Sequence, residues 1–111
     1  MKIYKQSYDV NYIQEINDTI KLYEEVIGYF ASRTHSLIEK FGNVGALEAL
    51  MDNVELQKGF KTLRDNNMLN KTFEAIIIKY KNVIEFDNNA IKIAEFRLKN
   101  PNWTKGLKKL S

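Results

Sequence analysis

Ser32, His35 and Glu39 are the first residues whose types and spacing could do chemistry. They stand at positions i, i+3 and i+7, so a helix would carry a hydroxyl, an imidazole and a carboxylate along one face, the set that nucleophilic catalysis uses. A single straight helix, however, provides no cleft, no second wall and no backbone donors for an oxyanion. We therefore expect no catalysis here, and we interpret His35 as a histidine that faces solvent or lies between helices.

Three carboxylates, Glu48, Asp52 and Glu55, would share one face if the chain stayed helical from residue 46 to residue 63. Such a row of hard oxygen ligands would suit Mg²⁺. Asp52 and Glu55 are better explained as the end of one helix and the acidic first turn of the next, where a negative charge favours the helix dipole. We therefore expect no metal site.

Residue types exclude further classes of site. The chain has no cysteine and one histidine, which rules out disulfides, thiolate metal sites, cysteine nucleophiles and multi-histidine centres within one chain. Gly42 and Gly45 have neither the preceding strand nor the lysine and hydroxyl of a phosphate-binding loop. The sequence therefore predicts a protein that is not an enzyme and that has no cofactor and no small-molecule substrate.

Basic residues are unevenly distributed along the chain. The net charge is +3, but the last fifteen residues contain five basic residues and no acidic one, so the first 96 residues carry −2. This segment could lie along nucleic-acid phosphates, with Trp103 stacked on an unpaired base, or contact another acidic partner. Alternatively, Trp103 and two leucines dock on the body of the protein while the lysines stay in water. The candidate nucleic-acid residues here are Arg97, Lys99, Trp103, Lys105, Lys108 and Lys109.

A second basic stripe comprises Lys58, Lys61 and Arg64, on the polar side of a helix predicted over residues 56–63. If this helix were the recognition helix of a helix-turn-helix, these side chains could contact bases and phosphates. The turn before it, at residues 52–54, matches that motif weakly. A solvated helix face is the alternative interpretation.

Apolar residues follow one another at alternating steps of three and four from Ile13 to Phe41, interrupted only by Thr34. This heptad pattern predicts one long N-terminal helix over about residues 12–41. Gly28 lies in the middle, where it costs up to about 1 kcal/mol relative to alanine, so either a neighbour approaches closely or the helix bends there. Gly42 is the expected end of the helix.

Shorter helices are predicted after Gly42, near residues 44–54, 56–63, 70–84 and 88–98, and Asp87 is the expected cap of the last one. Helical spacing around the isoleucines at 76–78 outweighs their strand propensity. Pro101 then interrupts the chain, and residues 101–111 form a basic C-terminal segment. The first eleven residues are an arm of uncertain form. We predict an all-α fold, a single-domain helical bundle over residues 1–111 with one long helix and three to five shorter ones.

Tyrosines in the arm and apolar residues of the long helix suggest an interface with another protein. Tyrosine is amphipathic and is enriched at protein interfaces. An arm packed across a second subunit would also explain why so short a chain has so long a helix. The predicted interface residues are Tyr4, Tyr8, Tyr12, Ile20, Tyr23, Ile27 and Phe30.

Two functional hypotheses follow from these patterns. The first is a non-catalytic protein that acts by protein–protein binding, as a regulator, inhibitor or assembly subunit, with a second copy of itself among the candidate partners. The alternative is a nucleic-acid-binding accessory protein that uses the basic residues above. Asn, Lys, Ile, Tyr and Phe make up 50 of the 111 residues, which suggests an A/T-rich genome such as that of a phage or mobile element. With no apolar run long enough to span a membrane, we expect no membrane contact and a cytoplasmic protein.

Overall fold

Residues 4–52 and 58–102 are described by the structure, a computed structural model. Throughout these residues the regular elements are helices, which confirms the predicted all-α fold. The helices are α1 (Val10–Ile27), α2 (Ser32–Asp52), α3 (Lys58–Asp65), the short 3₁₀ helix η2 (Leu69–Lys71), α4 (Phe73–Tyr80) and α5 (Asn88–Lys99).

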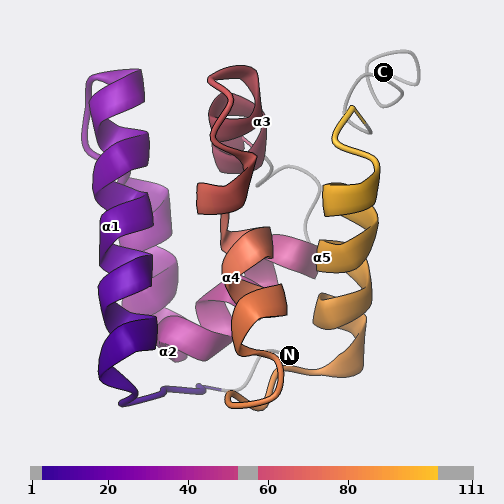
Figure 1. Ribbon diagram of the computed structural model, residues 1–111. Helices are drawn as coiled ribbons and strands as arrows, with labels where there is room; N and C mark the ends of the chain where they lie inside the picture. The colour runs from indigo at the N-terminus through magenta and orange to yellow at the C-terminus, as the bar shows by residue number, and fades with distance from the viewer. Residues whose placement is uncertain (1–3, 53–57, 103–111) are drawn as a thin grey trace.

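The long helix predicted over residues 12–41 is wrong, because α1 ends at Ile27. Gly28 adopts the left-handed conformation (φ 81°, ψ 11°), and its N–H donates to the Glu24 carbonyl at 2.8 Å, as a helix C-cap does. The chain then reverses, so that α2 begins at Ser32 and its first half runs back alongside α1 (Figure 1). The apolar period continues through the break because Leu37 and Ile38 of α2 pack against the same core as α1.

Gly42 bends α2 and receives the N-terminal arm. Its φ of 79° and ψ of 170° are open almost only to glycine, and a Cβ at this position would lie 2.3 Å from the Lys5 carbonyl oxygen. That oxygen accepts hydrogen bonds from Val44 N at 3.0 Å and Gly45 N at 3.1 Å, while Lys5 N donates to the Phe41 carbonyl at 2.8 Å. Residues 4–9 are therefore an extended segment bound across the bend, a form that the sequence left open.

The core is built where α1, the second half of α2, α4 and α5 meet. Tyr12 is fully buried, with its ring edge on Tyr80 and Phe86 and its hydroxyl donating to the Asn43 carbonyl at 2.8 Å. The isoleucines of α4 are helical as predicted, although Thr72, rather than Asn70, caps that helix. Asp87 caps α5 as predicted, because its carboxylate accepts from Ala90 N at 2.7 Å.

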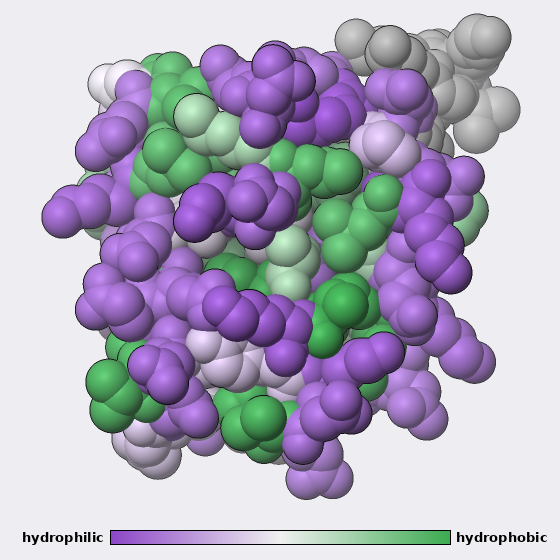
Figure 2. All heavy atoms as spheres, viewed as in Figure 1, coloured by the Kyte–Doolittle hydropathy of each residue, from purple (hydrophilic) through white to green (hydrophobic). Residues whose placement is uncertain are grey.

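In Figure 1, α1, α4 and α5 stand next to one another, α3 lies above α4, and the second half of α2 crosses behind them. Polar residues cover most of the face seen in Figure 2, and apolar residues lie between them in separate groups. None of the described helices is long and apolar enough to cross a membrane. This arrangement leaves a space bordered by the turn between α1 and α2 and by α3, α4 and α5.

Candidate functional site

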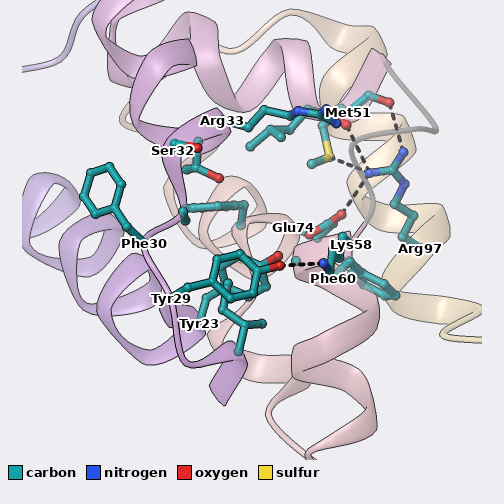
Figure 3. Close-up of a pocket in the computed structure, with 16 residues that line it drawn as sticks. Tyr23, Tyr29, Phe30, Ser32, Arg33, Met51, Lys58, Phe60, Glu74 and Arg97 are labelled. Carbon is teal, nitrogen blue, oxygen red and sulfur yellow. Dashed lines mark hydrogen bonds and ion pairs between the residues drawn. The ribbon is translucent and has the colours of Figure 1, made fainter. Parts of the chain in front are cut away.

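A pocket of about 330 Å³ lies in this space, and sixteen residues line it (Figure 3). Its apolar walls come from Tyr23 and Ile27 in the last turns of α1, from Phe60 of α3 and from Phe73 of α4. Each of these residues faces inward because the amphipathic period of its own helix points that face at the neighbouring helices. The hollow exists because the chain reverses at Gly28 and α2 starts again beside it.

A buried ion pair forms one wall of the pocket. Arg97 Nη1 lies 2.9 Å from Glu74 Oε2, and its Nη2 donates to the Met51 carbonyl at 3.1 Å. The guanidinium thus joins α5 to α4 and to the last turn of α2, where helix carbonyls lack partners of their own. Burial raises the pKa of Glu74, and the attraction of Arg97 opposes that rise. Arg97 is 3% exposed, so the prediction that it contacts nucleic acid is wrong.

Polar and aromatic side chains form the rim. Tyr29 and Phe30 are 56% and 64% exposed although both are large aromatic residues. Lys58 Nζ donates to the Tyr29 hydroxyl at 2.7 Å, and that hydrogen bond raises the pKa of Lys58. Arg33 is exposed on the first turn of α2. Figure 3 shows Arg33 on one side of the pocket and the Tyr29–Lys58 pair on the other.

The turn that carries Tyr29 and Phe30 is held by Glu24. Its Oε2 accepts a hydrogen bond from Ala31 N at 2.8 Å and lies 3.1 Å from His35 Nε2. The hydrogen bond from the Ala31 amide is the main cause of the lowered pKa of Glu24, with His35 adding to it. The Phe30 ring stacks on His35 with centroids 4.3 Å apart. His35 on α2 therefore contacts Glu24 on α1 while its side chain stays 40% exposed, so it combines the two expected environments, solvent and a neighbouring helix.

The predicted protein-interface residues fall into three groups. Tyr12 and Ile20 are buried in the core, so they offer no surface to a partner and their assignment to an interface is wrong. Tyr4 and Tyr8 are exposed on the arm. The three that the structure brings together are Tyr23, Ile27 and Phe30, all of which line the pocket.

The predicted basic stripe is divided in the structure. The Arg64 side chain is 9% exposed, and its guanidinium donates to the Pro101 carbonyl at 2.8 Å and pairs with Asp65. Lys61 is half-buried, whereas Lys58 and Lys99 are exposed. Trp103, Lys105, Lys108 and Lys109 lie outside the described residues. Lys58 is the one member of the stripe that lines the pocket.

The three carboxylates considered for a metal do not converge in the described structure. Glu48 is buried and accepts from Lys5 Nζ at 2.7 Å and from Asp87 N at 2.8 Å. Asp52 accepts from the Asn89 amide, and Glu55 lies outside the described residues. Across residues 4–52 and 58–102, no group of three His, Cys, Asp or Glu side chains is placed to hold a metal ion.

Sequence reasoning missed Arg33 and Glu74. Glu74 had a detectable signal, since it is a lone acid within the apolar run from Phe73 to Ile78, and a buried acid needs a partner. Arg33 had none, because only the reversal of the chain at Gly28 brings it to a pocket. Comparison with protein-family models, with curated proteins and with solved structures found no match, so a proposal of function rests on this geometry.

Proposed function

We propose that the protein is a non-catalytic binding protein and that it takes an apolar side chain of a partner protein into the pocket. The observation that carries this proposal is the exposure of Tyr29 and Phe30 at the rim of an apolar hollow. Aromatic side chains around a small pocket are typical of the centres of protein interfaces, where one buried anchor provides much of the affinity.

The polar groups around the pocket favour binding over catalysis. Glu74 is engaged by Arg97, the Tyr29 hydroxyl by Lys58, and the His35 imidazole by Glu24. Each of these contacts holds a helix or the turn in place, so the three groups have structural roles, and His35 is not among the residues that line the pocket. The volume of about 330 Å³ is also near the lower end of the range for small-molecule sites, which suits one inserted side chain.

The partner is proposed to be a different protein. The apolar heptad positions between Ile13 and Phe41, which could otherwise join two copies of the chain, include Ile16 and Ile20, and both are buried in the protein's own core. A role as regulator, inhibitor or assembly subunit, a phage or mobile-element source and a cytoplasmic location stay predictions. Nucleic-acid binding also stays a prediction, for Lys58, Lys61, Lys99 and the residues beyond the described part of the chain.

Selection of random displayed peptides on the immobilised protein tests this function. Gly59 lines the pocket, and a Cβ there would meet nothing within 4 Å, so Gly59→Phe can fill the hollow and Gly59→Ala is its matched control. We expect peptides that bind the wild type and Gly59→Ala and that fail to bind Gly59→Phe. Absence of such peptides, with circular dichroism showing that Gly59→Phe is folded, would overturn the proposal.

A further inference from the structure

We infer that the partner segment is acidic, and that it places a carboxylate between Arg33 and Lys58 while a neighbouring apolar side chain enters the pocket. This inference rests on the proposed function and adds the chemistry of the partner. It follows from the charges at the mouth of the pocket, which differ from those of its interior.

The mouth carries two cations that no carboxylate neutralises in the described structure. Lys58 is exposed, and its hydrogen bond goes to the hydroxyl of Tyr29 rather than to a carboxylate. Arg33 is exposed and forms no ion pair with any carboxylate of residues 4–52 and 58–102. Because Figure 3 places them on opposite sides of the pocket, a group between them would feel both charges.

Two acids on the described helices that border the pocket have partners of their own. Glu24 accepts from Ala31 N and pairs with His35, on the other side of the turn. Glu74 is 3% exposed and pairs with Arg97 in the pocket wall. Neither carboxylate forms an ion pair with Arg33 or Lys58, so within residues 4–52 and 58–102 neither acid offsets these two cations.

The interior of the pocket favours an uncharged side chain of the partner. Ile27, Phe60 and Phe73 present apolar surface, and the charges of Glu74 and Arg97 cancel each other. A charged side chain inserted here would lose water without gaining a partner. The complementary segment therefore combines one aromatic or branched aliphatic residue with an adjacent Asp or Glu, for which the planar guanidinium of Arg33 offers two parallel hydrogen bonds.

A peptide fits this site better than a nucleic acid does. Tight contact with a nucleic acid requires many phosphates to be neutralised, whereas the mouth offers two cations around an apolar hollow. The chemistry of a protein segment, a carboxylate next to an apolar side chain, uses both parts of the site. An oligonucleotide is nevertheless an anion, and the test below includes one as a competitor.

The test uses the peptides selected above on the full-length protein. We expect Asp and Glu to be enriched next to an apolar residue. The dissociation constant of a selected peptide, measured by fluorescence anisotropy, should rise roughly three- to tenfold with Arg33→Gln or Lys58→Gln, and the loss should shrink in high salt. A peptide whose acids are changed to amides should bind the wild type and both variants equally. Lys92→Gln, which removes an exposed cation of α5 outside the pocket, is the matched control and should leave affinity unchanged.

The outcomes separate this inference from the function on which it rests. The inference is overturned, and the function stands, if the selected peptides fail to bind Gly59→Phe but are not enriched in Asp or Glu. The same conclusion follows if they bind Arg33→Gln and Lys58→Gln with the same affinity as the wild type. Displacement of the peptide by a short oligothymidylate, weakened by the same two substitutions, overturns the peptide assignment in favour of nucleic acid. If the peptides still bind Gly59→Phe, both the proposed function and the acidic partner segment are contradicted.

Discussion

Arg97 Nη1 lies 2.9 Å from Glu74 Oε2, and the two side chains are 3% and 4% exposed. Through this pair α4 and α5 are joined to each other, and through the Leu50 and Met51 carbonyls they are joined to the end of α2. The same pair forms a wall of the pocket. The same interaction therefore contributes both to the proposed binding site and to the packing of α2, α4 and α5.

Removing the cation of this pair should destabilise the protein strongly. Arg97→Met leaves the Glu74 carboxylate buried without its counter-charge, and we expect the free energy of unfolding to fall by about 3–5 kcal/mol. The double variant Arg97→Met/Glu74→Leu should recover most of that loss, because neither charge is then buried alone. Urea denaturation measures both values. Arg33→Met, which removes an exposed cation, is the control, and a loss as large as that of Arg97→Met would contradict this account.

The Gly28→Ala substitution should change stability in opposite directions depending on whether residues 12–41 form one helix or two helices separated at Gly28. If one helix spanned residues 12–41, Gly28→Ala would stabilise the protein by up to about 1 kcal/mol. Because Gly28 has a φ of 81°, we expect it to destabilise by about 1–2 kcal/mol instead. Gly59→Ala, in the ordinary helical backbone of α3, should stabilise by about 0.5–1 kcal/mol. Thermal unfolding of the two variants decides the sign.

Alanine at Gly42 should release the N-terminal arm. The new Cβ would collide with the Lys5 carbonyl oxygen, and the backbone conformation at this residue is strained for any other amino acid. We expect a loss of roughly 2–4 kcal/mol in unfolding free energy, from strain and from the lost hydrogen bonds. Hydrogen exchange locates the effect, since the amides of Val44 and Gly45 should lose protection. Unchanged protection at these two amides would mean that the arm does not need Gly42.

The turn between α1 and α2 should weaken in acid. The pKa of Glu24 is lower in the folded protein than its ordinary value of 4.5, chiefly because its carboxylate accepts from Ala31 N. The ionised form therefore stabilises the fold above that value, and the stabilisation is lost as the pH falls through the folded pKa. We expect Glu24→Gln to lower Tm near neutral pH and the difference from wild type to shrink well below pH 4.5. Glu25→Gln, at an exposed neighbouring carboxylate, is the control and should change Tm less.

Local signals in the sequence determined the helices and several of their ends. The spacing around Ile76, Ile77 and Tyr80 indicated a helix despite strand-prone residues, and Asp87 was recognisable as the cap of α5. These features depend on residues within one or two turns of each other, which is the range over which capping and amphipathic period act. They could therefore be predicted without knowing what each helix contacts.

The tertiary structure alone decided which glycine ended the first helix, where Arg97 pointed and whether a pocket formed. A heptad pattern shows that one face of the chain is apolar, but it reads the same in one long helix and in two helices that fold back on one core. Arg97 looked like part of a basic tail because its partner, Glu74, is 23 residues away in the sequence. The pocket needs five elements at once, so no local pattern could predict it. Long-range packing sets these features because each depends on which apolar faces meet after the chain turns at Gly28 and Gly42.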